Sequence, residues 1–237
     1  MPSTARAYPP ENLRKPQRGK LDAIDYAHTY LKIRSFADLG GIGSVFGQYS
    51  FYAIEKPGID CGILVDLERN DWMQEQVAQR DGLSVIRGNF TSSEIADAVG
   101  DIDAVLLFDV LLHQVRPDWN HVLELYAPQT QCFIIANPQW EQTAETVRLI
   151  ELGRERYLNA VPPSKRHEEL FDRLDEVFEH FGRPFRDCPH VWQWGITDED
   201  VLSTLGRLGF RLDYMARHVP FWGANGFVNK AFVFSRE

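Results

Sequence analysis

The sequence lacks the features that would place the chain in a membrane or an oxidising compartment. Only three of its 237 residues are cysteines, and because these lie far apart without metal-ligand spacing, we expect free thiols and no metal site. No apolar run approaches the ~18 residues that a membrane-spanning helix requires. The first residues are polar and contain prolines, unlike a signal peptide. We therefore expect a cytoplasmic protein.

Basic residues are also in short supply. Lys and Arg total 25 against 34 Asp and Glu, which gives a formal net charge of −9. A chain of this charge with no basic run has little general affinity for nucleic-acid phosphates. We therefore expect no nucleic-acid or membrane partner. The length and a hydrophobic content of 44% are typical of one large α/β domain, with or without an insertion.

The sequence does contain a regular alternation of short apolar runs and amphipathic segments. The apolar runs predict five strands, at 36–39, 63–65, 83–87, 103–109 and 132–136. The amphipathic segments predict helices at 21–33, 45–53, 72–78, 93–99 and 118–126. Strands that are apolar on both faces and separated by helices indicate a mainly parallel sheet covered on both sides. We expect the Asn137-Pro138 step to end the fifth strand.

The pattern changes after Trp140. Charged amphipathic segments predict two helices, at 141–158 and 165–181. Thr197 and the acids after it form a strong helix start, and strand-like runs follow at 210–217 and 230–235. We therefore divide the chain into an N-terminal arm and helix (1–33), a core (34–140), a helical insertion (141–195) and a closing helix with strands (196–237).

The most informative residues lie where the first two strands end. The first strand ends in Asp38, the second ends in Asp66, and a glycine-rich turn follows the first. The turn contains Gly40, Gly41 and Gly43. In open α/β sheets the backbone approaches a nucleoside at such a turn, and an acid on the next strand accepts hydrogen bonds from the ribose. These residues therefore predict a nucleoside cofactor.

Two features help to choose the cofactor. A nicotinamide dehydrogenase carries a third glycine where its helix packs closely on the strand, but Phe46 occupies that position and Gly47 comes one residue late. Asp38, directly before the glycines, can order the turn beside the amino-acid end of S-adenosylmethionine. We therefore expect S-adenosylmethionine. An NAD-dependent oxidoreductase and a non-catalytic cofactor-binding protein remain as alternatives.

Together these motifs resemble those of the class I S-adenosylmethionine-dependent methyltransferases. The segment 36–43 is similar to the family's first motif, D-x-G-x-G-x-G, with Ile42 and Ser44 in place of two glycines. Gly209-Phe210 and the run 231–235 are similar to its closing strands. The resemblance implies a Rossmann-like, doubly wound sheet of seven strands, mainly parallel, with an antiparallel strand near the C-terminus and the insertion after strand five.

The same resemblance implies which residues bind the cofactor. Asp66 would hold the ribose, with Leu67 beside the adenine, and the side-chain oxygen of Asn89 would accept from the adenine amino group. The end of the fourth strand would face the methionine part and the substrate. The full expected set is Asp38, Gly40, Gly41, Gly43, Asp66, Leu67, Asn89, Phe90, Phe108 and Asp109.

Methyl transfer to an alcohol by in-line displacement benefits from a general base, since the cofactor already supplies an activated methyl group. His113 is the best candidate because it follows the fourth strand near the carboxyl edge of the sheet and titrates near neutrality. A structural histidine in the turn is the other interpretation. We therefore expect O-methylation of a small-molecule or sugar acceptor. The oligomeric state is left open.

The insertion is expected to cover the substrate. Trp192 and Trp194 would project to one side of an extended segment and wall a pocket for a flat ring or a sugar face. A hydrophobic plug between insertion and core is the alternative. The expected substrate-binding residues are His113, Trp140, Trp192, Trp194 and Trp222.

N-methylation of an amine or heteroaromatic ring also stays open. Asn137-Pro138-Gln139-Trp140 is similar to the N-P-P-aromatic tetrapeptide with which amino-methyltransferases hold a target amine. Gln139 replaces the second proline, however, and the tetrapeptide follows the fifth strand instead of the fourth. We therefore expect oxygen to be the acceptor atom.

Overall fold

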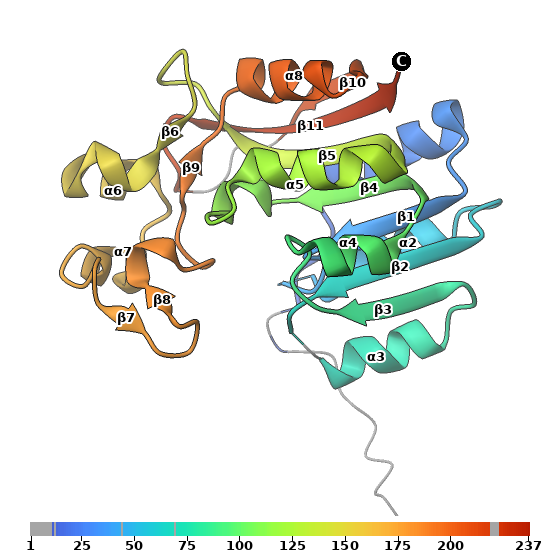
Figure 1. The fold of residues 1–237 in the computed structure, drawn as a ribbon, viewed down its shortest axis with the longest axis horizontal. Helices are drawn as coiled ribbons and strands as arrows, with labels where there is room; N and C mark the ends of the chain where they lie inside the picture. Colours follow the sequence, from blue (N-terminus) through green and yellow to red (C-terminus); the bar gives the residue numbers. More distant parts are fainter. Residues whose placement is uncertain (1–10, 12, 44, 69, 219–222) are drawn as a thin grey trace, which may run out of the picture.

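The computed structural model describes residues 11, 13–43, 45–68, 70–218 and 223–237. Its centre is a seven-stranded sheet in the order β10-β11-β5-β4-β1-β2-β3 (Figure 1). β11 runs antiparallel to its neighbours β5 and β10, and the pairs among β1 to β5 are parallel. The predicted Rossmann-like fold is thereby confirmed. The strands are β1 (Ser35–Leu39), β2 (Cys61–Asp66), β3 (Leu83–Arg87), β4 (Ile102–Phe108), β5 (Thr130–Trp140), β10 (Phe210–Arg217) and β11 (Phe227–Arg236).

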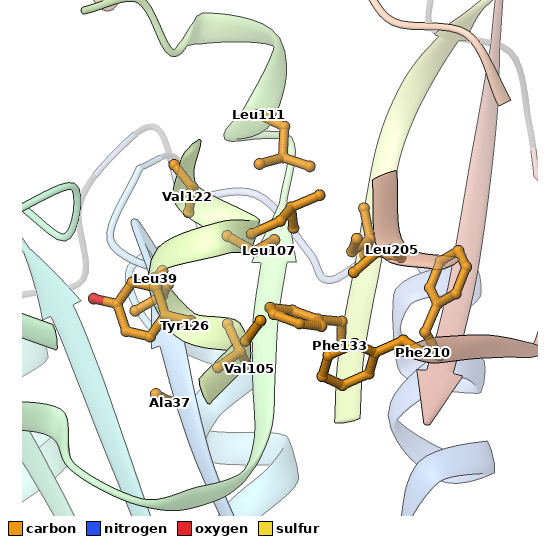
Figure 2. Packing of buried hydrophobic residues seen from close by; sticks show 14 of the residues in the cluster. Ala37, Leu39, Val105, Leu107, Leu111, Val122, Tyr126, Phe133, Leu205 and Phe210 are labelled. Carbon is orange, nitrogen blue, oxygen red and sulfur yellow. The ribbon is translucent and has the colours of Figure 1, made fainter. Parts of the chain in front are cut away.

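Helices cover both faces of this sheet and enclose two apolar cores. One face carries α1 (Arg18–Tyr26), the π-helical turn η1 (Ala27–Leu31), α2 (Gln48–Ile54) and α3 (Asp71–Ala78). The other carries α4 (Ser93–Val99), α5 (Trp119–Tyr126) and α8 (Asp198–Arg207). Figure 2 shows the second core, in which Phe133 of β5 contacts Phe210 of β10 at a ring distance of 4.9 Å. Each fully buried side chain of this size contributes roughly 1.5–3 kcal/mol.

Hydroxyl caps fix the starts of α4 and α8, and a glycine allows β1 and β2 to pack closely. The Ser92 hydroxyl accepts from Ile95 N at 3.3 Å to begin α4, and Thr197 caps α8 by accepting from Asp200 N at 3.3 Å. Gly62 stands opposite Phe36 in the sheet, and a Cβ there would lie 2.3 Å from the Phe36 ring. A side chain at position 62 would therefore displace this core aromatic residue.

The fifth strand is longer than predicted. It continues through Asn137-Pro138 to Trp140 and stays paired with β11. Trp140 N donates to Ile196 O at 2.7 Å, on the side of β5 away from β11. Backbone nitrogens two residues apart in a strand face the same side, so the nitrogen of Pro138 also faces away from β11. β4 has already ended at Phe108, so the missing N–H of Pro138 costs no sheet hydrogen bond.

The insertion lies beside one edge of the core in Figure 1 and contains only short elements. The two predicted long helices are wrong in extent. Gly153, at φ +85°, separates η4 from α6, and after α7 the chain forms a hairpin in which Phe178 stacks on Phe185 at 4.8 Å. The elements are β6 (Val147–Arg148), η4 (Leu149–Leu152), α6 (Arg154–Ala160), α7 (Lys165–Leu170), β7 (Val177–Phe178), β8 (Arg183–Pro184), η5 (Phe185–Asp187) and β9 (Trp194–Gly195).

Two further 3-10 turns flank α5, η2 (Leu111–His113) and η3 (Ala127–Gln129). Within the described ranges, no helix combines the length and the apolar character needed to cross a bilayer. The division of the chain into an arm, a core and an insertion stays a prediction.

Candidate active site

A cleft of about 940 Å³ opens at the carboxyl edge of the parallel strands. The ends of β1, β2 and β4 form its floor, together with residues that follow β3. The segment before α1 lines one part of the cleft, and the insertion lines another through residues such as Phe181, Arg183 and Trp192. The cleft therefore draws together parts of the chain that are distant in sequence.

The glycine turn after β1 is held against the end of β2. Gly40 N donates to Val65 O at 2.7 Å, and Ile42 N donates to Asp66 Oδ2 at 3.0 Å. Gly40 adopts φ +75°, and a Cβ there would lie 2.7 Å from Val110 Cγ1. At Gly43 an added Cβ would meet no described atom within 4 Å, although the residue lines the cleft. The turn thus presents bare backbone beside the Asp66 carboxylate.

Asp38 lies beneath this turn instead of projecting freely into the cleft. Its side chain is buried, accepts from Ser50 Oγ at 2.6 Å, and has a carboxylate oxygen 2.5 Å from where a Cβ on Gly41 would stand. Burial raises the pKa of this carboxyl to about 6, and the Ser50 hydrogen bond opposes that shift only in part. Asp38 therefore lies against Gly41 of the turn, and its role in ordering the turn stays a prediction.

The expected adenine-side residues line one end of the cleft. Leu67 is 52% exposed and Phe90 is half-buried, and both face the cleft. Asn89 Oδ1 accepts from Thr91 N at 3.1 Å and from Thr91 Oγ1 at 2.9 Å. This oxygen therefore already accepts two hydrogen bonds within its own loop, which the expectation that it accepts from the adenine amino group did not include. The group that Asn89 can offer is its side-chain N–H₂.

Phe108 and Asp109 line the cleft where β4 ends, as expected, but Asp109 has a partner that the sequence analysis missed. Its carboxylate forms an ion pair with the Lys20 ammonium of α1. Lys20 belongs to the buried face of α1, with Ala23 and Ile24 three and four residues later. A lysine on an otherwise apolar helical stripe was the signal that could have identified it.

His113 lies in η2, with its half-buried side chain lining the cleft. Its Nδ1 lies 2.8 Å from Val191 O, an acceptor, so Nδ1 carries the proton and Nε2 is left as the basic nitrogen. Burial lowers the pKa of His113, although Val191 O and Asp109 oppose that change. The imidazole is therefore neutral at neutral pH, the form that a general base requires.

The four tryptophans that were expected to bind the substrate do not share one position at the cleft. Trp192 lines the cleft, with its ring 6.4 Å from that of His113. Trp194 instead donates its indole N–H to Gln114 O at 2.5 Å, and Trp140 packs on Phe227 at 4.7 Å inside the insertion core. The expected double-indole wall is wrong because β9 begins only at Trp194, so the two indoles are not on one strand. Trp222 lies outside the described residues.

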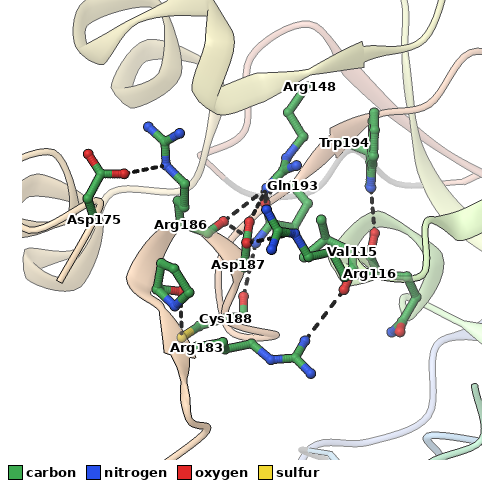
Figure 3. Close-up of polar contacts among 12 residues, drawn as sticks. Val115, Arg116, Arg148, Asp175, Arg183, Arg186, Asp187, Cys188, Gln193 and Trp194 are labelled. Atoms are coloured by element: carbon green, nitrogen blue, oxygen red, sulfur yellow. Dashed lines mark hydrogen bonds and ion pairs between the residues drawn. The ribbon is translucent and has the colours of Figure 1, made fainter. Parts of the chain in front are cut away.

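A polar network around the buried Asp187 links the insertion to the loop after β4 (Figure 3). Asp187, only 3% exposed, pairs with Arg148 Nη2 at 2.9 Å and with Arg116 Nε at 3.1 Å. Arg148 also donates to Gln193 Oε1 at 2.9 Å, and Arg183 reaches Val115 O at 3.5 Å. This network fixes the part of the insertion that closes the cleft.

The sequence matches no protein-family model and no curated protein. Solved structures resemble it in fold. The 1,6-didemethyltoxoflavin-N1-methyltransferase of Burkholderia thailandensis, with bound 1,6-didemethyltoxoflavin and S-adenosylhomocysteine, has a TM-score of 0.58 at 15% identity, over 92% of this chain and 78% of that one. The N-terminal domain of EvdMO1 with S-adenosylhomocysteine bound has a TM-score of 0.53 at 12% identity, over 93% and 82% of the two chains.

A third similar structure is an O-methyltransferase family protein from Burkholderia thailandensis, with a TM-score of 0.54 at 12% identity. The match spans 92% of this chain and 55% of that one. The strand order, the antiparallel β11 and these similarities agree with one another. The chain therefore has the Rossmann-like fold of the class I S-adenosylmethionine-dependent methyltransferases.

Proposed function

We propose that the chain transfers a methyl group from S-adenosylmethionine to a hydroxyl oxygen of a small molecule or sugar. The observation that carries this proposal is the position of Asp66, whose Oδ2 lies 3.0 Å from Ile42 N in the glycine turn. A ribose-binding carboxylate and a turn of bare backbone thereby meet in one cleft. That combination suits an adenosine cofactor with a polar tail.

The residues of the cleft fit such a cofactor. The adenosine part would lie by Asp66, Leu67 and Phe90, and the amino-acid end would lie over the turn 40–43. A volume of about 940 Å³ is near the upper end of the range for ligand pockets, about 300–1,000 Å³, which leaves room for an acceptor. Two of the similar structures contain S-adenosylhomocysteine, which supports the same choice of cofactor.

His113 is proposed as the general base. When bound, S-adenosylmethionine supplies an activated methyl group on a sulfonium. His113 Nε2 would accept the proton of the acceptor hydroxyl as the oxygen attacks, while Val191 O holds Nδ1–H and fixes the tautomer. Trp192 would form the adjoining wall of the acceptor pocket.

The tetrapeptide 137–140 reaches the cleft through Pro138. Asn137 Nδ2 donates to Pro138 O at 2.9 Å, and Asn137 is buried and not among the residues that line the cleft. The Pro138 carbonyl keeps a second lone pair, so N-methylation stays the alternative. We propose oxygen as the acceptor atom because His113 Nε2 can take up the proton of a hydroxyl.

A screen of hydroxylated small molecules and their amine counterparts tests the proposal, with release of S-adenosylhomocysteine as the readout. For any acceptor found, His113→Ala is expected to lower kcat by ~10²-fold or more without changing the affinity for S-adenosylhomocysteine. His121→Ala, which alters a histidine of α5 that is not among the residues lining the cleft, is the control.

Because burial lowers the pKa of His113, kcat should be constant at neutral pH and decrease only below the ordinary histidine value of about 6.5. Full turnover by His113→Ala, or methylation confined to the amines, would contradict the assignment.

A further inference from the structure

We infer that Lys20 and Asp109 together bind the amino-acid end of the cofactor, with the α-carboxylate on Lys20 and the α-ammonium on Asp109. This inference rests on the proposed function, because it assigns residues to one part of the proposed cofactor. Lys20 comes from the N-terminal helix, outside every motif that the sequence analysis identified.

The pair lies inside the cleft and not on the outer surface. Lys20 projects from the buried face of α1, and its side chain is 7% exposed, whereas that of Asp109 is 32% exposed. The Lys20 ammonium also lies 5.3 Å from the Tyr49 ring centroid and 5.8 Å from that of Phe108. Both charges of the pair border the cleft between α1 and the end of β4.

Lys20 retains hydrogen-bonding capacity for a ligand. An ammonium group has three N–H donors, and Asp109 and Tyr49 interact with two of them. Among the described residues, the third has no partner. Burial by itself would lower the pKa of Lys20, but the charge of Asp109 and the contact with Tyr49 outweigh it and raise that pKa. The group is therefore protonated at neutral pH.

The charges of the cleft indicate what this cation would bind. Of the described basic residues that line the cleft, Lys20 is the one that is buried. It lies close enough to the glycine turn to interact electrostatically with Asp38. A ligand carboxylate placed over that turn would therefore find its buried cation in Lys20.

The backbone around Asp109 fixes the position of its carboxylate. Asp109 adopts φ +57°, in the left-handed region that aspartate tolerates better than most residues, and its N–H donates to Ala136 O at 2.8 Å. Because an α-amino acid carries both charges, a neighbouring cation and anion of the protein can each bind the opposite group.

Three ligands that differ only in the tail test the inference by calorimetric titration. S-adenosylhomocysteine has both charged groups, decarboxylated S-adenosylhomocysteine keeps only the amine, and 5′-methylthioadenosine has neither. The unaltered protein should bind the first at least tenfold more tightly than the second. Equal affinities for these two would overturn the assignment without any variant.

Variants then test which residue binds the α-carboxylate and which binds the α-ammonium. Lys20→Met should lower the affinity for S-adenosylhomocysteine about 10- to 100-fold and should not lower the affinity for the other two ligands. Asp109→Asn should weaken both amine-bearing ligands and leave 5′-methylthioadenosine unchanged. Lys56→Met is the matched control, because Lys56 also pairs with a carboxylate, Asp25, and lies over a tyrosine ring, but is not among the cleft residues. If Lys20→Met does not fold, Lys20→Gln takes its place.

An equal loss of affinity for all three ligands in the Lys20 variant would mean that the pair only supports the fold, and would overturn the inference. So would unchanged binding of S-adenosylhomocysteine. If the unaltered protein binds neither 5′-methylthioadenosine nor S-adenosylhomocysteine, the proposed function itself fails. If the protein binds 5′-methylthioadenosine but Lys20→Met does not selectively weaken binding of S-adenosylhomocysteine, the inference fails and the proposed function stands.

Discussion

The buried carboxyl group of Asp38 makes the stability of the protein depend on pH. Its pKa is raised by burial from 3.8 to about 6, so the folded state holds a proton over a range where the unfolded chain has lost it. A raised carboxyl pKa contributes stability that is complete below the unfolded value and is lost as the pH rises through the folded value. The stability that protonated Asp38 contributes is therefore lost between about pH 4 and pH 6.

Asp38→Asn removes this titration and keeps an oxygen that can accept from Ser50. The free energy of unfolding of the unaltered protein, minus that of the variant, should fall by roughly 2–3 kcal/mol between about pH 4 and pH 7. Denaturant titrations across this range, without cofactor, measure the difference. Asp60→Asn, at an exposed ion pair with Arg34, is the control. A difference that stays constant with pH would show that the pKa of Asp38 is the same in the folded and the unfolded chain.

Asp66 has a different expected effect, because it would contact the ribose and not the tail. Asp66→Ala should weaken S-adenosylhomocysteine and 5′-methylthioadenosine by the same factor, about 10- to 100-fold, since both contain the ribose. Calorimetry with Asp60→Ala as the control measures this. Unchanged affinity for 5′-methylthioadenosine would exclude Asp66 as the ribose acceptor.

Among the elements, the insertion depends on one buried ion-paired carboxylate. Asp187→Ala leaves Arg148, whose side chain is 17% exposed, without its anion, and breaking a buried pair typically costs 3–5 kcal/mol. We expect faster amide hydrogen exchange across 147–195, with exchange in β1 and β2 unchanged. Asp172→Ala removes an exposed pair with Arg154 and should cost less than about 1 kcal/mol. Equal exchange in the two variants would mean that the network does not hold the insertion.

The sequence predicted the core elements better than the insertion, for a physical reason. β1 and β4 are buried on both faces and α4 and α8 begin at hydroxyl caps, so local pattern and tertiary environment agree. In the insertion the spacing of Phe171 and Phe178 resembled one face of a helix. Phe171 instead packs on Tyr157 of α6, and Phe178 stacks on Phe185 at the β7–β8 hairpin, contacts that no single-segment periodicity encodes.

Across the whole molecule, the motif residues could be placed from sequence and their partners could not. Asp38, Asp66 and the glycines lie together because parallel strands end at the same edge, which the strand order alone implies. Lys20 and Asp109 are 89 residues apart and meet only because α1 packs across the sheet. The hydrogen bonds from Thr91 to the side-chain oxygen of Asn89 were likewise not predictable, because loop geometry sets them.

The central claim is that a sulfonium nucleoside lies across the carboxyl edge of this sheet, and a thermal-shift comparison tests it most directly. A ligand at a hundred times its dissociation constant stabilises a protein by about 2.7 kcal/mol, which raises Tm by about 5–10 °C for a domain of this size. We predict such an increase with S-adenosylhomocysteine and none with NAD. An increase with NAD and none with S-adenosylhomocysteine would contradict the account.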